Sequence, residues 1–142
     1  MAGEQVYFSL GSNLGDRKRN LERALRKMDK AFGCHWLRVS PFLETEAWGF
    51  DGAPFLNCAV LYELEEEPAQ VLKKCKRIER RMGRRERLEY DAEGKRIYHN
   101  RRIDIDILLF GDRKVETPEL VIPHPRMDER DFVKETMKFI KD

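Results

Sequence analysis

The chain has 142 residues, of which 41% are hydrophobic and 38% are charged. This length suits a single domain with a buried core, and the net charge of +2 is too small for a general polyanion binder. No stretch approaches the roughly 18 apolar residues of a membrane span, and the first residues lack the pattern of a secretory signal. The widely spaced Cys34, Cys58 and Cys75 predict reduced thiols, so we expect a cytoplasmic protein.

The first predicted elements are a strand and a helix joined by a glycine-containing turn. Residues 6–10 form the strand, and residues 11–15 form the turn. A helix then begins near Asp16, carries apolar residues at helical spacing and stops at Gly33. Backbone N–H groups in such a turn could bind an anion, although ordinary turn formation explains the same residues.

Two further strands are predicted before the second helix. Residues 36–48 suit an extended strand, in which Pro41 indicates a bulge or an edge position. Residues 55–64 form a more apolar strand, with Asn57 near its start. A buried amide needs hydrogen-bond partners, so Asn57 either makes a structural turn contact or binds a ligand that offers a donor and an acceptor.

The second helix begins at Glu67 and Pro68 and ends at Gly83. Apolar residues form its buried stripe, while lysines and arginines on the other face predict a solvated surface. The next segment, residues 84–100, mixes arginines, acids and tyrosines without any period. Loops of this length are either functional lids or solvated linkers.

The most informative pattern lies in residues 101–111, where three isoleucines alternate with Asp104 and Asp106. In a strand both aspartates face one side, about 6–7 Å apart at the backbone. They can therefore bind one hard cation or a pair of cations, or they can simply face water. The apolar run that follows, residues 108–110, favours a strand that enters the core.

The order of elements predicts an α+β fold. Strand, helix, two strands, helix and strand give the ferredoxin-like βαββαβ core, with helices packed on a mainly antiparallel sheet. We expect the aspartate strand to be an inner strand of this sheet. After it, His124 is held rigidly between two prolines, and a terminal helix begins near Arg130.

Four segments of the chain together resemble the 6-hydroxymethyl-7,8-dihydropterin pyrophosphokinase family. They are FSLGSNLGD at 8–16, FLNCAV at 55–60, RRIDIDIL at 101–108 and IPHPRMDERDF at 122–132. The resemblance covers about residues 6–133 in the family's order. It implies that residues 1–142 form a single pterin pyrophosphokinase domain, with a mobile catalytic loop at 84–100 and a shortened C-terminal tail at 133–142.

The resemblance implies transfer of pyrophosphate from ATP to the hydroxymethyl group of the pterin, with release of AMP, in folate biosynthesis. It implies that Asp104 and Asp106 bind two Mg²⁺ ions. The catalytic positions that match the family are Arg84, Arg101, Asp104 and Asp106. Those near the nucleotide are Glu79, Ile107 through its main chain, His124 and Arg130. Those near the pterin are Thr45, Phe55, Asn57 and Phe132.

The expected partners are therefore ATP and a reduced pterin, without nucleic acid or membrane, and the expected state is a monomer. Two alternatives remain open. A two-metal nuclease or nucleotidyl transferase could use the same aspartates, but it would need a basic track for nucleic acid. A non-catalytic or engineered variant of the same fold could bind nucleotide and pterin without turnover.

Overall fold

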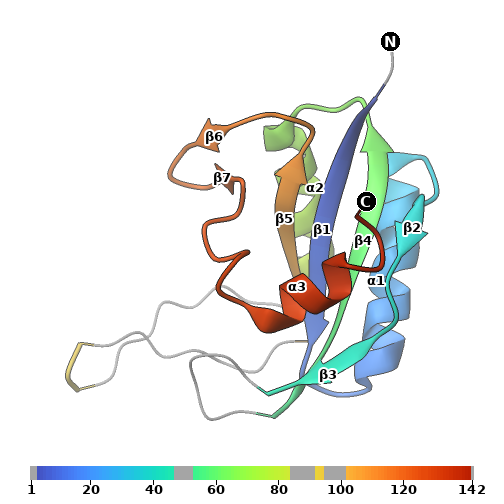
Figure 1. The fold of residues 1–142 in the computed structure, drawn as a ribbon. Coiled ribbons are helices and arrows are strands. Elements are labelled where there is room, and N and C mark those ends of the chain that lie inside the picture. The colour runs from blue at the N-terminus through green and yellow to red at the C-terminus, as the bar shows by residue number, and fades with distance from the viewer. Residues whose placement is uncertain (1–2, 47–52, 84–91, 95–101, 142) are drawn as a thin grey trace.

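The computed structural model describes residues 3–46, 53–83, 92–94 and 102–141, and its main body is a sheet with helices on both faces (Figure 1). The elements in chain order are β1 (Glu4–Ser12), α1 (Arg17–Phe32), β2 (Arg38–Val39), β3 (Leu43–Thr45), β4 (Phe55–Leu64), α2 (Pro68–Arg81), β5 (Asp104–Phe110), β6 (Val115–Glu116), β7 (Val121–Ile122) and α3 (Asp131–Met137). The sheet has the order β2-β4-β1-β5, and β3 also pairs with β4. All of these pairs are antiparallel, which confirms the predicted α+β fold.

The sheet separates two hydrophobic cores. Helices α1 and α2 pack on one face and α3 crosses the other (Figure 1). The larger core joins β1, β4 and β5 to α1 and α2, and it includes Phe8, Met28 and Ile105. The smaller core joins the same strands to α3 through residues such as Leu61 and Val133. No helix in the described residues is long and apolar enough to cross a membrane.

The helix ends follow the predicted capping residues. The Asp16 side chain accepts the Arg19 N–H at 3.1 Å, which satisfies one of the free donors at the start of α1. Gly33 ends α1 in the left-handed region at φ 71°, a conformation that glycine adopts without steric cost. At α2, Glu67 and Gln70 form a reciprocal capping box.

The early strands differ from the prediction in their limits. Strand β1 continues through Gly11 to Ser12, where a turn was expected, because both residues pair with β4. The strand predicted over residues 36–48 is split into β2 and β3 around Pro41, and both parts pair with β4. Proline has no N–H for a ladder, and Pro41 lies between two short strands that each pair with β4 alone, which confirms the edge position and adds an interruption that was not predicted.

The prediction that the aspartate strand lies inside the sheet was wrong. Strand β5 is the last strand in the sheet order and pairs with β1. Its register with β1 shifts between Phe8↔Ile107 and Tyr7↔Leu109, so Leu108 is an extra, bulged residue. The Leu108 carbonyl points away from β1 and accepts the His124 N–H at 3.0 Å. The apolar run at the end of β5 is therefore explained by a bulge and by an edge that other segments cover, and not by a position inside the sheet.

The aromatic centre of the larger core gives a test of the fold. Phe8 is fully buried, stacks on Phe32 at 5.8 Å and meets Tyr62 edge to face at 5.8 Å. We expect Phe8→Ala to lower the free energy of unfolding by about 3–5 kcal/mol, because it removes this packing and leaves a cavity.

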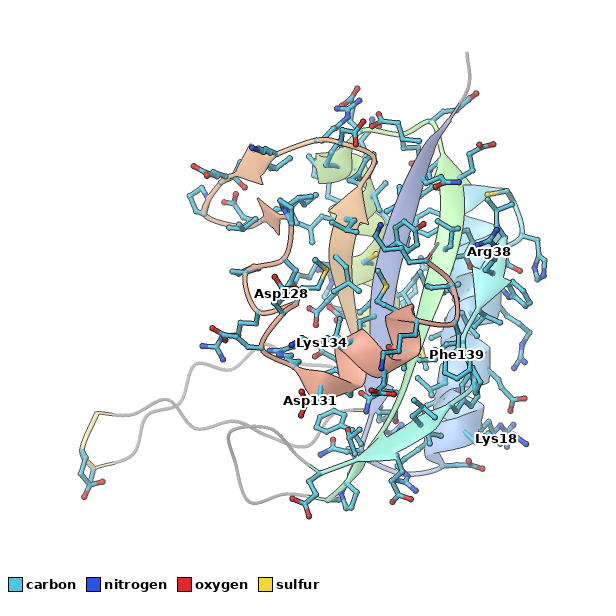
Figure 2. The ribbon with its side chains drawn as sticks, in the orientation of Figure 1. Lys18, Arg38, Asp128, Asp131, Lys134 and Phe139 are labelled. Atoms are coloured by element: carbon cyan, nitrogen blue, oxygen red, sulfur yellow. The ribbon has the colours of Figure 1, made fainter. Side chains whose placement is uncertain are left out.

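The matched control is Phe139→Ala, since Phe139 follows α3 at the surface and is 58% exposed (Figure 2). Its free energy of unfolding should change by no more than about 0.5 kcal/mol. Urea denaturation followed by circular dichroism measures both. Equal losses for the two variants would contradict the assigned core.

Candidate active site

A row of cross-strand neighbours connects the aspartate strand to the residues predicted near the pterin. Gly11 of β1 pairs with Asp104 of β5 on one side and with Asn57 of β4 on the other. Directly paired residues place their side chains on the same face of a sheet. Asp104 and Asn57 therefore face the same side, two strand spacings or about 10 Å apart at the backbone. Gly11 has no side chain to fill the space between them.

Asn57 is held over Gly11 by its neighbours. It is 2% exposed, and its Nδ2 donates to Thr45 Oγ1 at 2.6 Å. A Cβ atom on Gly11 would lie 2.9 Å from Asn57 Oδ1 and 3.2 Å from Phe55 Cδ1. Phe55 in turn pairs with Thr45 across β4 and β3. The structure thus places Asn57 and Phe55 over Gly11, where a Cβ atom would be too close to both, and Thr45 lies beside them.

Asp104 and Asp106 lie on the face of β5 opposite α1 and α2. Both are half-buried, and they alternate with Ile105 and Ile107, which belong to the larger core. This confirms the predicted orientation of the two aspartates. Two carboxylates that share a face and reach solvent suit Mg²⁺, because this ion usually takes one or two carboxylates and completes its shell with phosphate and water. In the described ranges, no group of three or more His, Cys, Asp or Glu residues has the geometry of a metal site.

The start of α3 brings a cation to the aspartates. Arg130 precedes the helix, and its Nη1 lies 3.6 Å from Asp106 Oδ2. Its guanidinium carbon also lies 5.8 Å from the centre of the Phe132 ring. Arg130 therefore lies between Asp106 and Phe132, although Arg130 and Phe132 were predicted for different ligands.

A pocket of about 230 Å³ lies along the outer edge of β5. Its lining residues come from α2, β5 and the segment around β7: Leu72, Lys76, Ile105, Asp106, Ile107, Pro118, Glu119, Leu120, Val121, His124 and Pro125. The Ile105 N–H points to this edge, away from β1, and bonds to Glu79 at 2.8 Å. The main chain of Ile107, two residues further along the strand, points the same way.

The sequence analysis did not identify the outer walls of this pocket. Lys76 was assigned to the solvated face of its helix, but it lines the pocket and its Nζ lies 3.8 Å from Glu79 Oε1. The spacing of three residues between Lys76 and Glu79 was the available signal, since such positions are neighbours on a helix. The position of Leu120 and Val121 depends on how the chain returns to β5, which local sequence does not encode.

His124 is fixed on both its backbone and its ring. Its N–H donates to the Leu108 carbonyl, and its Nδ1 accepts the Arg126 N–H at 3.2 Å. A neutral ring with Nδ1 as acceptor carries its proton on Nε2. Burial lowers the pKa of His124 below its usual value, the positive charges of Arg130 and Arg126 lower it further, and Asp104 opposes them. At neutral pH the ring is therefore an uncharged donor.

Most of the predicted positions fall into two adjoining groups. Asp104, Asp106, His124 and Arg130 gather around the exposed face and outer edge of β5, with Phe132 beside Arg130. Thr45, Phe55 and Asn57 form the second group. Glu79 lies beneath β5 at 1% exposure. The predicted positions Arg84 and Arg101 lie outside the described residues, as does nearly all of the predicted loop at 84–100.

Comparisons with known proteins bear on this site. A family model described as 7,8-dihydro-6-hydroxymethylpterin-pyrophosphokinase (HPPK) matches residues 7–142. A 2-amino-4-hydroxy-6-hydroxymethyldihydropteridine pyrophosphokinase from Porphyromonas gingivalis is 47% identical over 131 residues, which cover 91% of this chain and 85% of that protein. The protein of the same name from Bacillus subtilis is 37% identical over 129 residues, or 90% of this chain and 72% of that protein.

A solved structure supports the fold independently. The chain of an HPPK-DHPS in complex with substrates superposes with a TM-score of 0.65 over 97% of this chain. The two sequences are 13% identical, and this chain spans 40% of that chain. At this identity the similarity concerns the fold alone, and it agrees with the predicted ferredoxin-like core.

The charges around His124 predict how its titration responds to substitution. Arg130→Gln removes a positive charge that disfavours the imidazolium, so the pKa of His124 should rise. Asp104→Asn removes a negative charge that favours the imidazolium, so the same pKa should fall. NMR titration of the imidazole signals measures both shifts. Glu135→Gln, an exposed site on α3 paired with Lys138, is the control and should leave the pKa unchanged. Shifts of the same sign in the first two variants would contradict the assigned surroundings.

Proposed function

Because this chain belongs to the 7,8-dihydro-6-hydroxymethylpterin-pyrophosphokinase family, we propose that it transfers pyrophosphate from ATP to 6-hydroxymethyl-7,8-dihydropterin in folate biosynthesis. AMP is the second product. The observation that carries the proposal is the row formed by Asp104, Gly11 and Asn57. It places an acidic strand and a buried amide on one face of the sheet, with a glycine between them.

The pterin binds at the Asn57 end of this row. Because Asn57 Nδ2 donates to Thr45, the orientation of the amide is fixed and Oδ1 is directed toward Gly11. An acceptor held in this way suits the N–H groups on the edge of a pterin ring. Phe55 and Phe132 supply aromatic surface for the flat ring, since aromatic rings stack with favourable geometry.

ATP binds at the β5 end of the row. The pocket at the outer edge of β5 has apolar walls from Leu72, Leu120 and Val121, which suit a nucleobase beside the main chain of Ile107. His124 and Asp106 both line this pocket, and Arg130 lies beside Asp106. A neutral histidine donor and an arginine fork can both bind phosphate oxygens. Arg84 and Arg101, proposed from the resemblance, contact the same phosphate chain.

Asp104 and Asp106 hold two Mg²⁺ ions. Mg²⁺ held there would supply positive charge that neutralises the phosphate oxygens during the transfer. The chain itself contributes the positions of the two reactants: the acidic strand, His124 and Arg130 fix the triphosphate, while Asn57 fixes the ring that carries the hydroxymethyl group. Such positioning can account for a large part of a phosphoryl-transfer rate. We also propose that the chain works as a single-domain, cytoplasmic monomer without a nucleic-acid partner.

The products distinguish this activity from its alternatives. Incubation with ATP, Mg²⁺ and the pterin should release AMP and the pterin pyrophosphate in equal amounts, as chromatography would show. Release of ADP would indicate an ordinary kinase and contradict the proposal. Binding of both ligands without AMP, measured by calorimetry on the same sample, would indicate the non-catalytic variant.

Removing either aspartate should abolish most of the turnover. Asp104→Ala or Asp106→Ala should lower kcat by at least roughly 10³-fold, on the order of 4 kcal/mol. Asp112→Ala is the matched control, because Asp112 is exposed just beyond the other end of β5. A steady-state AMP assay measures all three variants. A loss below about tenfold in both site variants would show that the pair does not hold the metal.

A further inference from the structure

Glu79 has a partner that its predicted role does not explain. It lies near the end of α2, is 1% exposed, and accepts the Ile105 N–H through Oε2 at 2.8 Å. That N–H points to the outer edge of β5, where the described part of the chain has no further strand in the sheet. A buried N–H without an acceptor is costly, and a bond to a carboxylate is stronger than one to a neutral group. Glu79 therefore fixes the edge strand at one defined peptide.

This peptide lies between the two aspartates. It joins Asp104 to Ile105, and Asp106 follows directly. Asp104 and Asp106 project from the same face of this short stretch of backbone. A rotation of the peptide about the strand axis would therefore redirect both side chains together. The carboxylate of Glu79 holds the strand from the α2 side, while Asp104 and Asp106 face the α3 side.

The burial of Glu79 argues against direct contact with a nucleotide. Its Oε1 lies 3.8 Å from the Nζ of Lys76, whose side chain is 37% exposed and lines the pocket at the edge of β5. The pocket lining therefore includes Lys76, whereas Glu79 lies beneath it and is not among the lining residues. A ligand in this pocket would meet the ammonium group and not the carboxylate.

We propose that Glu79 is a positioning residue that sets the geometry of the two metal-binding aspartates through the Ile105 peptide. This role replaces the predicted contact between Glu79 and the nucleotide. The inference rests on the function proposed above for its link to the metal, while the Glu79–Ile105 bond stands independently of that function.

Three variants separate the possible roles. Glu79→Leu removes the acceptor but keeps an apolar side chain of similar size. Glu79→Gln keeps an oxygen that can accept the Ile105 N–H but loses the charge. Ile78→Val, at the adjacent buried position of α2, disturbs packing without touching the hydrogen bond. It is therefore the control for a merely structural effect.

The first measurement is amide exchange at Ile105, followed by NMR in the protein without ligands. Wild type, Glu79→Gln and Ile78→Val should all protect this amide. Glu79→Leu should increase its exchange rate about tenfold relative to the amides of β1. Equal protection of Ile105 in Glu79→Leu and wild type would overturn the inference, whatever the enzyme's activity.

The second measurement is the affinity for a nonreactive ATP analogue, with Mg²⁺ and with EDTA. Residues that support a metal-binding side chain typically affect metal affinity about 10–100-fold. Glu79→Leu should therefore reduce the gain in affinity that Mg²⁺ provides by about tenfold or more, while the affinity in EDTA changes less than about twofold. Ile78→Val should keep the full gain.

Two outcomes would overturn the inference here. An equal loss of affinity in EDTA and in Mg²⁺ would mean that Glu79 contacts the nucleotide. An unchanged gain with lower stability would mean that it only supports the fold.

If Glu79→Leu does not fold, Glu79→Gln decides: protection of Ile105 with unaltered affinity in EDTA supports positioning, and loss of either overturns it. If the wild type releases no AMP, the proposed function fails, and the exchange result at Ile105 still decides the role of Glu79.

Discussion

The pairing of β1 with β5 on one side and β4 on the other is the constraint on which the site depends. It brings Asp104 and Asn57 into one row across Gly11, although 47 residues of sequence separate them. A slip of one residue in either ladder would turn the side chains of one strand to the opposite face. Burial of the large apolar side chains of β1 and β5 in the core with α1 and α2 prevents such a slip. The register that stabilises the core therefore also sets the site.

The outer edge of β5 shows how an edge strand can carry a site. Two groups from outside the sheet bond to its backbone: the carboxylate of Glu79 at Ile105 and the N–H of His124 at Leu108. Both groups also belong to segments that line the pocket, since α2 forms one wall and His124 forms another. The bulge at Leu108 directs its carbonyl away from β1, where it accepts the His124 N–H. The same contacts that cover the outer edge of β5 therefore also form the walls of the pocket.

Local sequence predicted what depends on local structure. Alternation placed Asp104 and Asp106 on one face, and capping residues such as Asp16 and Gly33 gave the helix limits. The edge position of β5 and the strand pairing of Gly11 were missed, because strand order and cross-strand pairing are settled by contacts distant in sequence. The buried position of Glu79 was missed for the same reason, since its partner is 26 residues away. The resemblance supplied residue roles that spacing alone did not.

The interruption at Pro41 has a consequence for behaviour at high protein concentration. An unbroken row of free N–H and C=O groups at a sheet edge can add a strand from another chain, which leads to aggregation. On the side of β4, the edge consists of the separate short strands β2 and β3, with Pro41 between them. On the side of β5, a carboxylate and a histidine backbone occupy the edge. Within the described part of the chain, neither margin presents a long template, so the sheet itself hinders intermolecular strand addition.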